Sequence, residues 1–212
     1  AGMSNQADLK KHNLSIAWAQ DKVAVFCDVK KALGIEESGK SKSRKSEAVR
    51  IVKLLDELKT DQNFDNLSVG IITFYAKQVD EIFREASKKG YTEQRADGSF
   101  EITLPYRETD DGREKLRIGS VDSFQGKEFD IVILSTVRSN TISRTHENYK
   151  KVFGFLTLEN RLNVAFSRSQ KLLIVVGDSE MLSDDFAKTY VEGLHEFYTN
   201  LSTDKQYGNR IQ

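Results

Sequence analysis

Short apolar runs alternate with amphipathic segments along most of this chain. The predicted strands are compact apolar runs, several of them rich in β-branched residues: 23–29, 69–74, 115–121, 130–137 and 171–177. The predicted helices carry apolar residues at helical spacing or fill the intervals between those runs: 46–58, 78–89, 158–169 and roughly 180–201. Strands that alternate with helices predict an α/β fold, with a mainly parallel sheet and helices on both faces.

The intervening segments are polar and predict less regular structure. Residues 1–22 read as a lead-in, with an ambiguous helix ending near Trp18, and Ala1-Gly2-Met3 resembles residues left by expression cloning. The domain itself is expected over 23–202. Its predicted irregular parts are a mobile loop at 30–45, a hairpin-like insertion at 91–113, a polar loop at 138–153, and a polar tail at 203–212.

Composition narrows the function classes. Lys+Arg and Asp+Glu each total 32, so the net charge is zero and gives no general support for nucleic-acid binding. The single cysteine, Cys27, excludes an internal disulfide and suits a reducing compartment. No apolar run approaches the roughly 20 residues of a membrane span. We therefore expect a cytoplasmic protein without a membrane partner. The three histidines share no metal-ligand spacing, and no metal site is expected.

Residues 34–41, GIEESGKS, match the phosphate-loop pattern G-x-x-x-x-G-K-[ST]. A working phosphate loop would make the chain a standalone NTPase that uses Lys40. It needs a strand directly before the first glycine and a helix starting at the Lys-Ser pair. Here the strand stops near Val29, the helical pattern begins several residues after Ser41, and Glu36 adds negative charge. We therefore interpret the match as chance, and the nearby basic residues as a solvated loop: Lys40, Lys42, Arg44 and Lys45.

Two longer blocks carry a family resemblance. Residues 118–138, IGSVDSFQGKEFDIVILSTVR, resemble motif V of superfamily 1 helicases, and 154–178, GFLTLENRLNVAFSRSQKLLIVVGD, resemble motif VI. The nearest branch is that of the nonsense-mediated-decay helicase and senataxin. A third segment, 71–78, resembles the family's Thr-Pro-Tyr followed by Gln. The resemblance implies a RecA-like fold of the P-loop NTPase type, specifically the second of two RecA-like motor domains.

Residue by residue, the resemblance implies two kinds of contact. Arg168 matches the arginine that reaches the γ-phosphate, and Glu128 the acid that binds the nucleotide ribose. Gly126 allows close approach, and Arg161 orders the motif or supports nucleotide binding. The candidates for nucleic-acid contact are Thr73, Tyr75, Ser120, Ser123 and Arg138. Each has an ordinary alternative: an ion-paired helix arginine, a solvated turn residue, or a tyrosine of the core.

The resemblance also implies partners. ATP and Mg²⁺ would be held mainly by a first RecA-like domain of the same polypeptide, which these residues do not contain. Single-stranded DNA or RNA would cross both domains, and the isolated chain would be inactive. The alternative from another class is a non-enzymatic nucleic-acid or protein binding module with a helicase-like fold.

Overall fold

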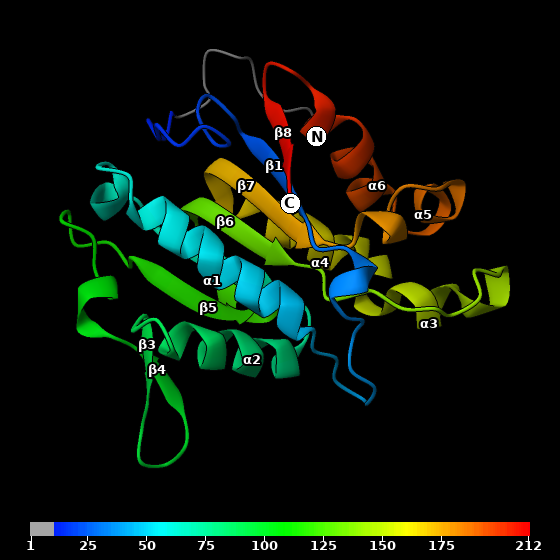
Figure 1. The fold of residues 1–212 in the computed structure, drawn as a ribbon, viewed down its shortest axis with the longest axis horizontal. Coiled ribbons are helices and arrows are strands. Elements are labelled where there is room, and N and C mark those ends of the chain that lie inside the picture. Colours follow the sequence, from blue (N-terminus) through cyan, green and yellow to red (C-terminus); the bar gives the residue numbers. More distant parts are fainter. Residues whose placement is uncertain (1–10) are drawn as a thin grey trace.

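A parallel sheet forms the centre of the protein. A computed structural model describes residues 11–212. The sheet's strands are β1 (Ala24–Asp28), β2 (Val69–Thr73), β5 (Leu116–Ser120), β6 (Phe129–Ser135), β7 (Ser169–Gly177) and β8 (Gly208–Ile211). Their order is β5-β2-β6-β7-β1-β8, and every neighbouring pair is parallel (Figure 1). The predicted α/β class with a mainly parallel sheet is confirmed.

Helices cover both faces of the sheet. They are α1 (Lys45–Lys59), α2 (Ala76–Ser87), α3 (Tyr149–Phe153), α4 (Glu159–Ser167), α5 (Asp185–Tyr190) and α6 (Glu192–Thr199). Successive strand residues point to opposite faces, so Ile131 and Ile133 pack in the core under α1 and α2. Val132 and Leu134 pack in the second core, with α4, α5 and α6. Among residues 11–212, every helix is too short or too polar to span a lipid bilayer.

The insertion is a small hairpin, as predicted. Strands β3 (Thr92–Gln94) and β4 (Phe100–Ile102) pair antiparallel and form a separate sheet. Phe83 of α2 stacks on Phe100 of β4, with ring centroids 5.8 Å apart, and this contact holds the hairpin against α2.

Three predicted segments differ from the structure at the chain's two ends. Residues 11–22 form a turn instead of a helix ending at Trp18. The side chains of His12 and Asp61 bind the backbone groups that a helix would use. The rest of the lead-in lies outside the described residues. The single helix expected over 180–201 is two short helices, since Asp184 caps α5 by accepting from the Ala187 N–H and Val191 leaves helical geometry. The polar tail contributes β8, which pairs with β1.

The loop segments also hold more structure than expected. The 138–153 loop ends in α3, and the 30–45 loop is fixed by buried side chains described below.

Candidate nucleotide and nucleic-acid sites

Motifs V and VI meet at one end of the sheet, where strands β6 and β7 begin. Phe129 and Ser169 are register partners, so the residues just before them, Glu128 and Arg168, lie next to each other. The Phe129 N–H also donates to the Arg168 carbonyl, at 2.9 Å. Forty residues of sequence separate the two side chains, and the parallel pairing of β6 with β7 brings them together.

Arg168 follows the last turn of α4 and keeps its guanidinium half-exposed. Its three nitrogens donate to oxygens without full charge: the Val164 carbonyl at 3.1 Å, the Lys127 carbonyl at 3.2 Å and the Ser167 hydroxyl at 3.0 Å. Within residues 11–212, no carboxylate lies within ion-pair distance of it. The positive charge is therefore held in place without being neutralised, which suits an anionic ligand.

Glu128 and Gly126 complete this end of the sheet. The Glu128 carboxylate is exposed and accepts from the Gln170 amide at 2.6 Å, which leaves lone pairs for a hydroxyl. Gly126 has φ +76°, a left-handed conformation that strains other residues, and a Cβ there would meet nothing within 4 Å. The glycine is thus required by the turn, and the space beside it is open.

Arg161 is not brought to this end of the sheet. It lies seven residues before Arg168 on α4, about 10 Å along the helix axis. Its guanidinium pairs with Asp122 at 3.0 Å and lies 5.6 Å from the centroid of the Phe155 ring. Of the two roles implied for Arg161, this contact favours ordering, because it joins α4 to the 3₁₀ turn Val121–Phe124 after β5.

The candidate nucleic-acid residues lie at the opposite end of the sheet, where strands β2 and β5 finish. Thr73 ends β2 and is the register partner of both Ser120 and Ser135. Its hydroxyl is buried and has no hydrogen-bond partner within the described part of the chain. Ser120 is half-exposed, and its carbonyl accepts from the hydroxyl of exposed Ser123 at 2.7 Å. These hydroxyls lie where the carboxyl ends of parallel strands place ligand contacts.

Tyr75 and Arg138 belong to the interior. The Tyr75 ring packs on Phe155 at 5.2 Å, and its hydroxyl accepts from the Phe155 N–H at 3.2 Å. Burial raises the pKa of Tyr75, and the nearby Arg138 partly offsets that rise. Arg138 is 3% exposed, donates to the Val152 and Lys151 carbonyls, and pairs with Glu36 at 3.0 Å. The core alternative therefore describes Tyr75, and Arg138 reaches no open surface in this structure.

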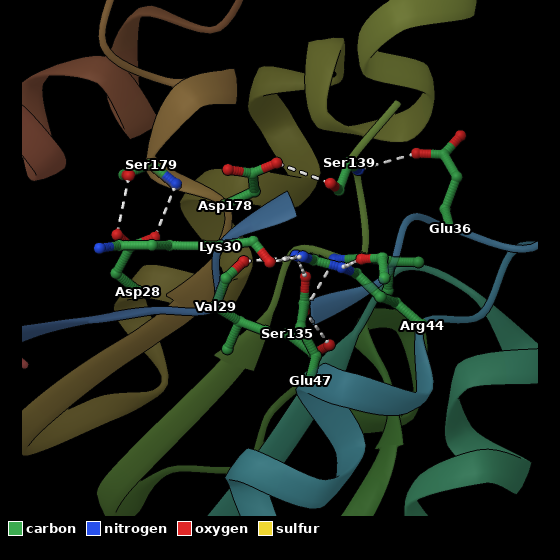
Figure 2. Close-up of polar contacts among 12 residues, drawn as sticks. Asp28, Val29, Lys30, Glu36, Arg44, Glu47, Ser135, Ser139, Asp178 and Ser179 are labelled. Carbon is green, nitrogen blue, oxygen red and sulfur yellow. Dashed lines mark hydrogen bonds and ion pairs between the residues drawn. The ribbon is translucent and has the colours of Figure 1, made fainter. Parts of the chain in front are cut away.

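A buried polar network lies at the same end of the sheet, and sequence analysis missed it. Figure 2 shows Arg44 donating to the carbonyls of Val29 and Lys30 and to Glu47. Arg44 also donates to the Gly34 carbonyl, at 2.8 Å. The Glu47 carboxylate accepts in turn from Ser135 at 2.7 Å and from the Val137 N–H at 2.9 Å. The prediction that Arg44 is a solvated loop residue is wrong: Arg44 is 1% exposed, because its guanidinium finds four acceptors inside the protein, three carbonyls and the Glu47 carboxylate.

A second cluster in Figure 2 fixes the 34–41 segment. Glu36 accepts from the Ser139 N–H at 2.9 Å and from the Asn140 amide at 3.1 Å, besides pairing with Arg138. Ser139 also donates to Asp178 at 2.6 Å. Glu36 and Glu37 are adjacent acids in a polar loop, and nothing in the sequence distinguishes the one whose partners lie about 100 residues away.

The 34–41 segment does not form a phosphate loop. A 3₁₀ turn, Lys31–Leu33, separates it from β1, and α1 begins only at Lys45. The N–H groups of Glu36 and Glu37 donate to the Ser139 and Ser43 carbonyls, so they are not available to a phosphate. The interpretation of the pattern as a chance match agrees with this geometry. Among residues 11–212, no group of three or more His, Cys, Asp or Glu side chains is arranged to hold a metal ion.

Comparison with known proteins places the chain in a family. The family model AAA_12, described as an AAA domain, matches residues 2–180. Among curated relatives, a putative helicase mov-10-B.2 from Danio rerio is 36% identical over 117 residues, covering 55% of this chain and 10% of the relative. The RNA helicase Mov10l1 from Mus musculus is 33% identical over 117 residues, covering 55% and 8%. A putative ATP-dependent RNA helicase, ECM32 from Saccharomyces cerevisiae, is 29% identical over 180 residues, covering 72% and 14%.

The chain therefore spans only about a tenth of the length of these relatives. A crystal structure of the C-terminal domain of a possible DNA helicase from Lactobacillus plantarum WCFS1 covers 90% of this chain and 85% of its own, with 12% identity and a TM-score of 0.47. The resemblance to superfamily 1 helicases drawn from motifs V and VI is confirmed. The chain belongs to the AAA-domain family, as a RecA-like domain of the helicase type.

Proposed function

We propose that this chain is the second motor domain of an ATP-dependent helicase and supplies the arginine finger. The observation that carries the proposal is that Arg168 and Glu128 occupy neighbouring positions at the starts of β7 and β6, while the Arg168 guanidinium forms no ion pair with a carboxylate among the described residues. A binding module without nucleotide chemistry has no use for a cation held in that way.

The residues at this end of the sheet fit a nucleotide. Arg168 is permanently charged and fixed by three oxygen acceptors, so its guanidinium would stabilise charge on the γ-phosphate without reorganising. Glu128 would accept a hydrogen bond from a ribose hydroxyl, and the open space beside Gly126 would admit the ring. ATP supplies the phosphoanhydride bond whose hydrolysis drives strand movement. We propose that the Mg²⁺ ligands and the phosphate loop come from a first RecA-like domain of the same polypeptide.

The opposite end would contact single-stranded nucleic acid. The hydroxyls of half-exposed Ser120 and exposed Ser123 suit phosphate oxygens, contacts that position a strand without reading its sequence. The unpartnered Thr73 hydroxyl is fully buried and would take part only if the structure around it opened. Arg138 would take part only if its pair with Glu36 opened. DNA and RNA both remain candidate substrates. A cytoplasmic location fits the single cysteine, Cys27, which is buried and reduced.

The test needs the longer polypeptide that contains both motor domains. Arg168→Ala is expected to lower nucleic-acid-stimulated ATP hydrolysis by about a thousandfold or more, the usual worth of an arginine finger, with little change in nucleic-acid affinity. Arg168→Lys should not restore the rate, because an ammonium lacks the planar fork. Arg95→Ala, in the hairpin, is the matched control and should hydrolyse ATP normally.

A rate for Arg168→Ala within a few-fold of that of the unsubstituted protein would overturn the finger assignment. If the unsubstituted protein bound nucleic acid but hydrolysed no ATP, the non-enzymatic binding module would be the better description.

A further inference from the structure

A ladder of aromatic side chains lies beyond the ends of β6 and β7, between α3 and α5. Tyr149 stacks on Tyr190 with ring centroids 4.5 Å apart and planes 17° apart. His146 stacks on the Tyr149 ring at 6.1 Å. On the inner side, Phe186 meets Tyr190 edge-on at 4.8 Å and stacks on Phe153 at 5.5 Å. In Figure 1, α3 and α5 both lie past the tips of these strands, on the same side of the molecule.

The ladder runs from the core to solvent. Phe153 is fully buried, Phe186, Tyr190 and Tyr149 are half-buried, and His146 is exposed. The inner rings are ordinary core packing. An exposed imidazole stacked on a half-exposed tyrosine presents a flat π surface to water, which the packing of α3 against α5 does not require.

The outer rings are held rigidly. His146 Nδ1 is hydrogen-bonded to the Tyr190 hydroxyl, and Arg144 pairs with Asp184 and donates to the Glu180 carbonyl at 2.7 Å. From beneath, Arg138 binds the Val152 and Lys151 carbonyls of α3. A surface fixed by contacts to two elements loses little conformational entropy when a ligand stacks on it.

Positive charge accompanies the rings. The Lys150 ammonium lies 5.8 Å from the centroid of the Tyr149 ring. Lys150, Lys151 and Lys188 are exposed, and none forms an ion pair among residues 11–212. Glu147 and Asp185 are also exposed nearby, so the patch is basic only in part. Flat aromatic rings with adjacent ammonium groups are the elements that bind unpaired bases and their phosphates.

The position suits a continuation of the proposed nucleic-acid path. Thr73 and Ser120 end β2 and β5, while the ladder follows β6 and β7, which are the next strands at the same end of the sheet. Exposed Phe155 packs on Tyr75, close after Thr73 in the chain, and belongs to the turn Gly154–Thr157 that joins α3 to α4.

We propose that His146 and Tyr149 form a stacking subsite for a base of single-stranded nucleic acid, with Lys150 beside its phosphate. This inference rests on the proposed nucleic-acid site at the same end. It assigns a contact to the bases, whereas the site proposed at Ser120 and Ser123 would contact only phosphates.

The experiment is fluorescence anisotropy of the full 212-residue chain at low salt, with two labelled probes of equal length: a single-stranded oligouridine and its abasic counterpart. The abasic strand keeps the phosphates and removes the stacking partner. His146→Ala and Tyr149→Leu are each expected to weaken binding of oligouridine by about fivefold or more, and to leave binding of the abasic strand unchanged. His146→Phe should keep the affinity for oligouridine. Lys150→Ala should weaken both probes equally.

Tyr207→Leu, another half-buried tyrosine outside the ladder, is the control and should bind as the unsubstituted chain does. Circular dichroism checks that each variant is folded; if Tyr149→Leu unfolds α3, the exposed His146 decides alone. Unchanged oligouridine affinity in His146→Ala would overturn the stacking subsite and leave the nucleic-acid site standing. No binding of either probe by the unsubstituted chain would overturn both, while the ATP-hydrolysis test of Arg168 would still decide the nucleotide site.

Discussion

Asp130→Asn is expected to destabilise the sheet at the end that carries Glu128 and Arg168. Asp130 is the second residue of β6, and its side chain is almost fully buried. It accepts from the Ser68 N–H at 2.9 Å, and it pairs with Arg113 at 2.7 Å and with Lys171 at 2.8 Å. One carboxylate thus joins β6, β7, the start of β2 and the segment before β5.

The magnitude follows from the pKa of this carboxyl. Burial opposes ionisation of Asp130, but the hydrogen bonds from Lys171, from the Ser68 N–H and from Arg113 outweigh it and lower the pKa from 3.8 to about 2. A carboxyl shifted by that amount contributes about 2 kcal/mol to the free energy of unfolding at neutral pH. Lys171 and Arg113 still reach solvent, so they are not stranded by the substitution, and the total cost should be about 2–3 kcal/mol.

The sign of the pH dependence is fixed by the lowered pKa. The Asp130 carboxyl binds its proton less readily in the folded state than in the unfolded state. Its contribution to the free energy of unfolding is therefore complete above pH 3.8 and is lost as the pH falls towards 2. Urea unfolding followed by Trp18 fluorescence, at about pH 6 and about pH 2, measures the free energy of unfolding of the unsubstituted chain and of Asp130→Asn. The difference in unfolding free energy between the unsubstituted chain and Asp130→Asn should shrink by about 2 kcal/mol at the lower pH.

Other carboxyl groups titrate in the same window, but they are common to both proteins and cancel in the difference. Asp110→Asn, at an exposed turn, is the matched control and should lose almost nothing. A difference for Asp130→Asn that is equally large at both pH values would refute the electrostatic reasoning and assign the cost to packing alone.

Two further predictions concern the 34–41 segment. Glu36→Ala should lower the free energy of unfolding by about 3 kcal/mol, because it leaves the buried Arg138 guanidinium without its carboxylate. Thermal unfolding measures this loss. Glu37→Ala, a change at the exposed neighbouring residue, should lower the melting temperature much less. Calorimetry of the chain with Mg-ATP should show no heat of binding that depends on Lys40, since the N–H groups of Glu36 and Glu37 bind carbonyls and α1 begins only at Lys45. Tight binding that is lost in Lys40→Ala would mean that a phosphate loop does form.

Much of the fold was predictable because apolar periodicity reports burial directly. The strand prediction at 69–74 matches β2, and the helix prediction at 46–58 matches α1, since both rest on continuous or periodic apolar residues. The same reasoning fails for buried polar side chains. Nothing local in the sequence distinguishes Arg44, which is buried, from Lys45, which is exposed, because burial of Arg44 depends on carbonyls that the chain folds around it.

The nucleotide site could be predicted from the sequence because its two residues belong to recognisable motifs that lie at the starts of two neighbouring strands. The pairing of β6 with β7 brings Glu128 to Arg168, and the two motifs themselves suggested both residues. Burial of Arg138 could not be foreseen, because its partner, Glu36, lies in a loop that resembles a different motif. The edge strand β8 has a mostly polar sequence, so no hydrophobic pattern predicts it. Its place in the sheet depends entirely on pairing with β1.

The position of β1 between β7 and β8 bears on how the chain folds during synthesis. Of the strands in this sheet, β1 is synthesised before the others, yet both its partners are encoded late: β7 begins at Ser169 and β8 at Gly208. Roughly 140 residues separate β1 from β7, which is on the order of ten seconds of translation. During that time an apolar strand, AVFCD, has two unpaired edges, the condition under which strands associate with the wrong chain. Chaperone dependence of the nascent chain should therefore end only when β8 has emerged.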